Sequence, residues 1–199
     1  MAKGDHVRFL KTFLKNPGAT GAVAPSSEAL SRAMVHGIEM DGEDLVVEFG
    51  PGTGPFTKAI EDILPNPKQY LGIERDPHFV SLLRSRFPDL TLIEGSAEEA
   101  ATHVETHRTD TGHRGRVKVV ISGLPFASLP DDVQKGILES LRELLPRGSE
   151  FRTFQYVHAY GLPKAVRFRK RMREIFGPVA VRGPIFWNLP PALVLTWSA

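Results

Sequence analysis

The sequence predicts an α/β domain with a doubly wound, mostly parallel sheet covered by helices on both faces. Short apolar runs rich in β-branched residues alternate with segments of helical periodicity, the pattern of strands joined by right-handed crossovers. A chain of 199 residues with 41% hydrophobic content can bury one substantial core and is too short for two large domains. A turn with three glycines follows the first apolar run, where sheets of this class bind ligands.

The predicted strands are short apolar runs, each followed by a turn or a helix. They are expected at LVVEF (45–49), YLGIE (70–74), LTLIEG (90–95), VKVVIS (117–122), FRTFQYV (151–157) and ALVLTW (192–197). Helices are expected between them, at 56–64, 77–87, 97–107, 131–145 and 164–176. The polar, glycine-containing segment 107–116 is expected to form an exposed loop.

The N-terminal segment has a different character. From Asp5 to Leu14 apolar residues recur at spacings of three and four with lysine and arginine between them, which predicts a basic amphipathic helix. A second helix is expected to be capped at Ser26 or Ser27. We therefore divide the chain into an N-terminal basic helix (1–17) and one main domain (18–199).

Composition excludes several classes of protein. The chain has no cysteine, so disulfides and cysteine-based metal sites are excluded. No apolar run approaches the roughly 18 residues of a membrane span, and the N-terminus does not resemble an export signal. We expect a cytoplasmic protein. His103, His107 and His113 have acidic, loop-like surroundings and are expected to be solvated, so no metal site is predicted.

The glycine turn reads EFGPGTGPFT. Gly50, Gly52 and Gly54 remove side chains from the turn and permit positive φ, and Thr53 offers a hydroxyl. The spacing G-x-G-x-G departs from the G-x-G-x-x-G of pyrophosphate-binding turns. Glu48 lies two residues before the first glycine, where an acid is unfavourable beside a pyrophosphate but suits a cationic amino-acid moiety.

Two further strand ends indicate an adenosine-bearing ligand. Glu74 ends the second predicted strand, twenty residues after Gly54, where a carboxylate can accept hydrogen bonds from ribose hydroxyls. Ser96 and Ala97 follow the third strand and could meet an adenine. Because Arg75 could pair with a 2'-phosphate, NADP stays an alternative at this point.

The motifs VVEFGPGTG, GIERD, EGSAEE and ISGLPF, in this order and spacing, resemble those of class I S-adenosylmethionine-dependent methyltransferases. Three segments resemble more specifically the bacterial phospholipid N-methyltransferases, which are themselves similar to rRNA adenine dimethyltransferases. They are FLKNPGATGAVAPSSEALSRAMV (13–35), SGLPF (122–126) and GPIFWNLPPALV (183–194). The resemblance runs from about Gly18 to Trp197.

This resemblance implies a Rossmann-like, seven-stranded sheet with a reversed last strand and S-adenosyl-L-methionine as the cofactor. The reaction implied is methylation of the amine of phosphatidylethanolamine towards phosphatidylcholine, by a peripheral protein on the cytoplasmic face of the membrane. By the family pattern, the turn with Glu48 would hold the methionine part, Glu74 the ribose, and Ser96 with Ala97 the adenine. The implied cofactor-binding residues are Ser26, Ser27, Glu48, Gly50, Gly52, Thr53, Gly54, Glu74, Ser96 and Ala97.

One departure concerns the segment after the fourth strand. Adenine N-methyltransferases of nucleic acids usually begin this motif with Asn or Asp, whose side chain helps to hold the exocyclic amine. This chain has Ser122 there. The missing amide disfavours a nucleobase and leaves room for a lipid amine, so no nucleic-acid partner is expected.

An alkylamine, with a reference pKa of about 10, must lose a proton before it can accept a methyl group. Candidate groups beyond the fifth strand are Tyr156, His158 and Tyr160, with Ser122 as a hydrogen-bond acceptor. From these, the predicted catalytic residues are Tyr160, His158 and Ser122. Tyr160 and His158 could equally make a structural hydrogen bond at the end of the strand.

Aromatic faces bind an alkylammonium group at every stage of methylation. We expect Phe126, Tyr160 and Trp187 to form such a wall. The basic segment 164–176 and the N-terminal helix would attach the protein to an anionic membrane surface. The alternatives are an rRNA adenine N6-dimethyltransferase and a non-catalytic membrane-surface binding protein with a retained cofactor fold. An NADP oxidoreductase is least favoured.

Overall fold

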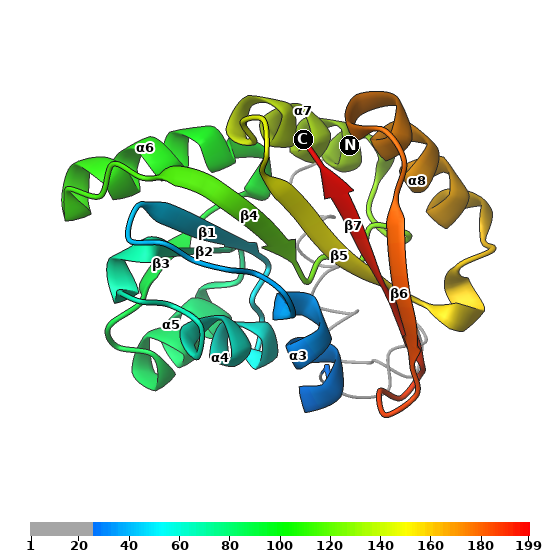
Figure 1. Ribbon diagram of the computed structural model, residues 1–199, viewed down its shortest axis with the longest axis horizontal. Coiled ribbons are helices and arrows are strands. Elements are labelled where there is room, and N and C mark those ends of the chain that lie inside the picture. The colour runs from blue at the N-terminus through cyan, green and yellow to red at the C-terminus, as the bar shows by residue number, and fades with distance from the viewer. Residues whose placement is uncertain (1–25) are drawn as a thin grey trace.

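A computed structural model describes residues 26–199, and the predicted N-terminal basic helix lies outside this range. The described chain forms one seven-stranded sheet (Figure 1). Its strands are β1 (Asp44–Phe49), β2 (Tyr70–Glu74), β3 (Thr91–Glu94), β4 (Arg116–Ser122), β5 (Glu150–Tyr156), β6 (Ala180–Ile185) and β7 (Ala192–Ser198). The spatial order is β3-β2-β1-β4-β5-β7-β6. Strands β1 to β5 pair in parallel, and β7 runs antiparallel between β5 and β6.

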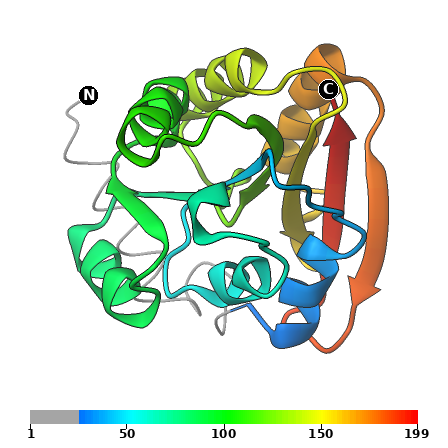
Figure 2. The same ribbon diagram turned by 60° about the vertical axis from the view of Figure 1, so that its left-hand side comes forward.

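Helices cover both faces of the sheet, as Figures 1 and 2 show. One layer contains α6 (Ala100–Thr111), α7 (Asp131–Leu144) and α8 (Pro163–Phe176), and the other contains α3 (Glu28–Val35), α4 (Pro55–Glu61) and α5 (Pro77–Arg86). The doubly wound fold and the reversed last strand are therefore confirmed. No helix in the described part of the chain is long and apolar enough to cross a bilayer.

The alternation along β1 explains the two layers. Leu45, Val47 and Phe49 belong to the apolar cluster under α6, α7 and α8, whereas Val46 belongs to the cluster under α3 and α4. All six residues of the strand are buried, as expected for a central parallel strand with helices on both sides. Glu48 is the exception in this apolar run, because its carboxylate is buried within the second layer.

The expectation of a loop over 107–116 is wrong in part, because only residues 112–115 lack regular secondary structure. Helix α6 continues through Thr111 and ends at Gly112, whose φ of 72° closes the helix in the left-handed conformation. His107 is fully buried rather than solvated, and one ring nitrogen lies 2.8 Å from the carbonyl oxygen of Lys68. Burial lowers the pKa of His107. The polar composition hid this contact, because His107 packs against a loop thirty-nine residues away in sequence.

Candidate functional site

The turn after β1 uses its glycines in two different ways. A side chain at Gly54 would lie 2.8 to 2.9 Å from Phe87 and Leu83, so this glycine permits close packing of the turn against α5. At Gly52, with φ of 59°, the nearest atom to such a side chain would be the Gly50 carbonyl oxygen at 4.0 Å. Gly52 therefore leaves open space beside the turn, which a ligand can occupy.

Glu74 connects the turn after β1 to the end of β2. Its Oε2 accepts a hydrogen bond from the Gly52 N–H at 3.0 Å, and its Oε1 accepts from the N–H groups of Arg75 and Asp76. Burial raises the pKa of Glu74, and the three backbone donors oppose that shift. A carboxylate has about four acceptor positions, so three backbone bonds leave one for a ligand hydroxyl.

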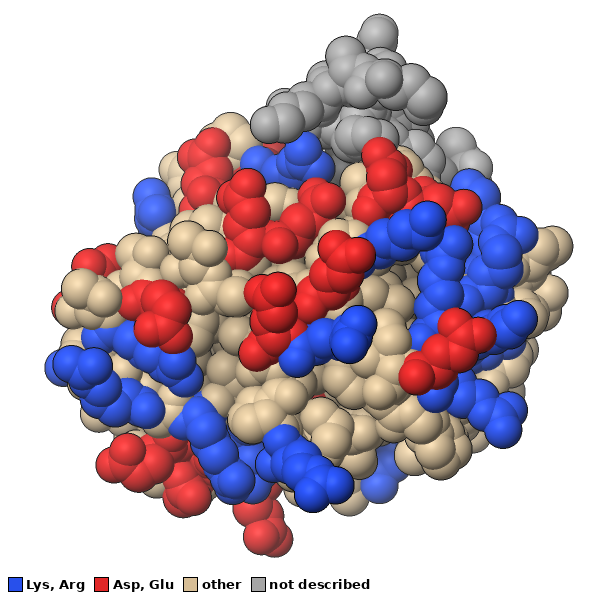
Figure 3. All heavy atoms as spheres, turned by 90° about the horizontal axis from the view of Figure 1, so that it is seen from above, with Lys and Arg blue, Asp and Glu red and all other residues tan. Residues whose placement is uncertain are grey.

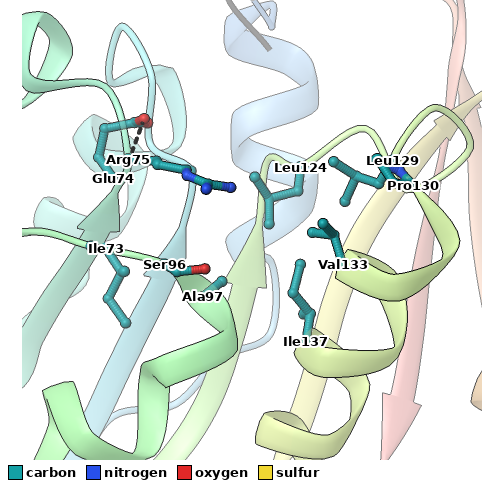
Figure 4. Close-up of a pocket in the computed structure, with 12 residues that line it drawn as sticks. Ile73, Glu74, Arg75, Ser96, Ala97, Leu124, Leu129, Pro130, Val133 and Ile137 are labelled. Atoms are coloured by element: carbon teal, nitrogen blue, oxygen red, sulfur yellow. Dashed lines mark hydrogen bonds between the residues drawn. The ribbon is translucent and has the colours of Figure 1, made fainter. Parts of the chain in front are cut away.

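A cavity lies over the carboxyl ends of β1, β2 and β4 (Figure 4). Glu74, Ser96 and Ala97 lie on one side of it, facing apolar side chains from α7 and the segment before it. The flat adenine base of a nucleoside could pack against these apolar side chains, and its ribose hydroxyls could bind the Glu74 carboxylate. Its lining residues are Gly50, Ile73, Glu74, Arg75, Gly95, Ser96, Ala97, Leu124, Leu129, Pro130, Val133 and Ile137.

Glu48 lies beneath the turn and is fully buried. Its Oε2 accepts hydrogen bonds from the hydroxyls of Thr57, at 2.8 Å, and Tyr70, at 2.6 Å. Desolvation raises the pKa of Glu48 to about 7, against these two bonds, which lower it. Oε1 is also buried and has no hydrogen-bond partner within the described chain. Glu48 does not line the cavity, so its contact with a cationic group stays a prediction. Sequence reasoning missed Thr57 and Tyr70, because nothing local marks them as partners of Glu48.

The structure brings some of the remaining predicted cofactor residues to this cavity and not others. Ser96 lines it while its hydroxyl caps the short helical turn that follows. Thr53 is half-buried on the glycine turn. Ser26 and Ser27 do not line the cavity. Ser27 caps α3 through its Oγ, which accepts from the Leu30 N–H at 3.2 Å, and closure of this segment over a cofactor stays a prediction.

A second cavity adjoins the first. Leu124 lines both, so the two cavities meet at the segment that follows β4. The lining of the second cavity contains no aspartate, glutamate, lysine or arginine. Its residues are Gly123, Leu124, Pro125, Phe126, Ala127, Ser128, Phe154, Gln155, Tyr156, His158 and Ala159.

The predicted catalytic residues differ in their positions around this second cavity. His158 lines it and stacks on Tyr156, with ring centroids 5.7 Å apart. Burial raises the pKa of Tyr156, so its phenol stays neutral. Ser122 is fully buried and its Oγ accepts from the Leu124 N–H at 3.2 Å. Tyr160 lies outside the lining, and their catalytic roles stay predictions.

The expected aromatic wall is wrong in part. Phe126 lines the second cavity and stacks on Phe168 at 4.3 Å between ring centroids, but Tyr160 and Trp187 do not line it. Trp187 is 88% exposed. Phe154 and Tyr156 supply the other aromatic rings of the lining. The prediction failed for Trp187 because the β6–β7 connection directs this side chain outward, and no local sequence pattern indicates that direction.

Comparison with known proteins places this site in a family. The chain is 33% identical over 191 residues to the ornithine lipid N-methyltransferase of Singulisphaera acidiphila, covering 94% of this chain and 93% of that protein. A ribosomal RNA small subunit methyltransferase A of Chlorobium phaeobacteroides is 36% identical over 66 residues, which cover 33% of this chain and 23% of that protein. No protein-family profile matches the chain.

Solved structures agree on the fold. The glycopeptide N-methyltransferase MtfA, solved with S-adenosylmethionine, superposes with a TM-score of 0.61 at 13% identity, covering 85% of this chain and 92% of that one. The glycine turn, Glu74 and the Ser96–Ala97 segment suit this cofactor, with Glu48 beneath the turn. The similarity to the lipid enzyme spans nearly the whole of both chains. The chain therefore belongs to the bacterial lipid N-methyltransferases, a family of class I S-adenosylmethionine-dependent methyltransferases.

Proposed function

We propose that this chain N-methylates the primary amine of a membrane lipid headgroup, with phosphatidylethanolamine and an ornithine lipid as the two candidate substrates. The observation that carries the proposal is the pair of cavities that meet at Leu124. One suits the adenosine of the methyl donor and the other offers aromatic and neutral polar groups to an amine. The name of the 33% identical relative supports a lipid as the acceptor.

S-adenosylmethionine, when bound, supplies a methyl group activated by its sulfonium. The residues of the chain must orient the amine and remove its proton, because only a neutral nitrogen has the lone pair that attacks the methyl carbon. Glu74, Ser96 and Ala97 would hold the cofactor beside this amine, and its sulfonium would accept the electron pair of the C–S bond that the amine displaces. His158 is the candidate proton acceptor, because its imidazole lines the cavity and can take up a proton.

The rings around the second cavity suit repeated methylation. Phe126, Phe154 and Tyr156 present aromatic groups in its lining. A ring face attracts an alkylammonium whether or not N–H donors remain, so the same lining can hold the amine after each methyl transfer.

A cation stands beside this cavity. The Arg169 Nη1 donates to Gln155 Oε1 at 2.5 Å, and the guanidinium lies 3.6 Å from the centre of the Tyr160 ring. Gln155 lines the cavity, and we propose that Arg169 binds the anionic part of a headgroup whose amine enters it. A phosphate and a carboxylate both satisfy this requirement.

The test supplies purified protein with S-adenosylmethionine carrying a radiolabelled methyl group and three acceptors in parallel. These are vesicles containing phosphatidylethanolamine, vesicles containing ornithine lipid, and undermethylated rRNA. Label in a lipid fraction supports the proposal and identifies the headgroup. Label only in RNA would overturn it in favour of an adenine dimethyltransferase, and no transfer to any acceptor would favour a non-catalytic membrane protein.

The same proposal gives the protein a location. A lipid acceptor confines the reaction to a bilayer surface, so we propose a peripheral protein on the cytoplasmic face. The exposed cations of α8 support attachment to anionic lipids, since each cation near such a surface contributes about 1 kcal/mol. Recovery of the native protein in the membrane fraction at low salt, and its release at high salt, would support this attachment.

A further inference from the structure

The connection between β6 and β7 exposes three large apolar side chains. Phe186 is 69% exposed, Trp187 is 88% exposed and Leu189 is 70% exposed. Trp197, in β7, is 1% exposed, so the two tryptophans have opposite environments. A single exposed apolar residue is common in proteins, but three within four consecutive positions form a patch that indicates an interaction surface.

The connection is held in place at its inward residue. Asn188, between the exposed side chains, is 2% exposed. Its Oδ1 accepts from the Ser27 N–H at 2.8 Å and its Nδ2 donates to the Pro190 carbonyl at 2.7 Å. Figures 1 and 2 both show this connection beside α3. The anchored asparagine holds its apolar neighbours outward, so their exposure follows from how the connection is built.

The connection also lies at the carboxyl edge of the sheet, where the second cavity opens. We call this second cavity, which would hold the amine of the methyl acceptor, the acceptor cavity. Ala192, the first residue of β7, pairs with Tyr156 at the end of β5, and Pro191 accepts a hydrogen bond from the Val157 N–H at 2.9 Å. Tyr156 lines the acceptor cavity. Val157 is itself 44% exposed, so apolar surface extends from the connection towards the cavity.

Charge on β6, and on α8, which contacts β7, indicates the kind of partner that the connection fits. Between residues 157 and 191 the chain has seven lysines and arginines and one acid, Glu174. The exposed cations of this range on α8 and β6 are Lys164, Arg167, Lys170, Arg173 and Arg182. Figure 3 views the molecule from the side opposite the connection and shows basic side chains gathered at the end where α8 lies. Aromatic and leucine side chains flanked by cations match the boundary between headgroups and acyl chains in an anionic bilayer.

We propose that Phe186, Trp187 and Leu189 insert into an anionic bilayer and hold the acceptor cavity at headgroup level. The inference rests on the proposed lipid substrate, because a lipid amine must reach the cavity without leaving the membrane. The β6–β7 connection is then a membrane-binding element distinct from the exposed cations of α8, which act through charge at longer range.

The two tryptophans allow a direct measurement on the full chain. Vesicles of phosphatidylglycerol and phosphatidylcholine in equal parts contain no amine substrate, so binding is measured without turnover. Insertion of Trp187 will shift the tryptophan emission to shorter wavelength and protect it from acrylamide, while buried Trp197 contributes a constant background. Trp187→Phe will lose the emission shift and retain vesicle binding.

Substitution separates insertion from other roles. The triple variant Phe186→Ser, Trp187→Ser, Leu189→Ser will bind these vesicles at least tenfold more weakly and methylate bilayer lipid correspondingly more slowly. Its methylation of a dispersed short-chain lipid amine will be unchanged. Leu82→Ser, at an apolar residue of α5 that is 36% exposed, is the matched control and will bind vesicles normally.

The other possible results show whether a bilayer or a second copy of the chain covers the patch of Phe186, Trp187 and Leu189. Unchanged vesicle binding by the triple variant, or no emission shift in the wild type, would overturn the proposal whatever the enzyme methylates. A blue-shifted Trp187 emission before vesicles are added, with self-association that the triple variant loses, would show that a second copy covers the patch. Insertion without methylation of any lipid would support the membrane contact and overturn the proposed substrate instead.

Discussion

On the β1–β3 side of the carboxyl edge, the chain bonds its own polar groups to one another. Glu74 accepts from Gly52, and Glu48 accepts from Thr57 and Tyr70. On the β5–β7 side, His158 and Trp187 are exposed. The first half is organised before any ligand binds, as a constant cofactor requires. The second half exposes these side chains, which agrees with the lipid substrate and the membrane contact that we propose.

We expect the largest effect from a substitution at Gly52, which should weaken the binding of S-adenosylmethionine. A valine there has φ of 59° imposed on it and places its methyl groups in the open space beside the turn. We expect S-adenosylmethionine affinity to fall by more than a hundredfold in calorimetric titration. Gly112→Val is the control, because Gly112 has φ of 72° and nothing within 4 Å of the added side chain. Both variants should lose similar stability, and near-normal cofactor binding by Gly52→Val would exclude the turn from the site.

A substitution at Glu48 tests whether the β1–β3 side of the site, which we call the cofactor half, is organised at a cost in stability. Its pKa of about 7 in the folded chain lies above the ordinary glutamate value of 4.5, so the folded chain binds an extra proton between these pH values. The stability from Glu48 is full below pH 4.5 and is lost as pH rises to about 7. The difference between a pKa of 4.5 and one of about 7 corresponds to about 3 kcal/mol.

Glu48→Gln removes this titration. The free energy of unfolding of the variant relative to the wild type should rise by about 3 kcal/mol between pH 4.5 and 8, measured by urea denaturation. His107 and Glu74 also titrate with shifted pKa values, but both remain in the variant and largely cancel in the difference. A difference that does not change with pH would mean that Glu48 is ionised throughout.

A substitution at His158 tests the proposed chemistry of the β5–β7 side of the site, which we call the acceptor half. If its imidazole takes the proton from the amine, His158→Ala should lower kcat by about a hundredfold and leave cofactor affinity unchanged. His78→Ala, at an exposed histidine of α5, is the matched control and should keep full activity. An active His158→Ala enzyme would transfer the role to Tyr156 or Tyr160, which substitution by phenylalanine would then separate.

The two halves also differ in how far the sequence predicts them. The turn, Glu74 and Ser96–Ala97 lie at the ends of consecutive strands, so periodicity alone places them at one edge of the sheet. The apolar wall from α7 was missed, although Val133 and Ile137 have the spacing of one helix face. That spacing shows that the face is buried and does not show whether a ligand or the core covers it.

Contacts between distant segments account for the other errors. Asn188 binds Ser27 across 161 residues of sequence, and this bond fixes the connection that directs Trp187 outward. Tyr70 reaches Glu48 because Val46 and Tyr70 are register partners in neighbouring strands. Neither contact has a local signature, since each depends on the packing of the finished sheet.

We expect the smallest effects from substitutions on α8, which should change methylation of lipid in vesicles only modestly. Comparing Arg169 with Arg173 separates a local headgroup contact from general attraction to the membrane. Arg173 is exposed on the same helix, so Arg173→Met removes one charge and should weaken action on anionic vesicles by about fivefold or less. Arg169→Met also removes the group beside Gln155 and Tyr160, and should raise KM for the lipid by about tenfold at unchanged kcat. Equal effects of the two variants would mean that Arg169 contributes charge alone, and the acceptor half would then contain no anion contact from this helix.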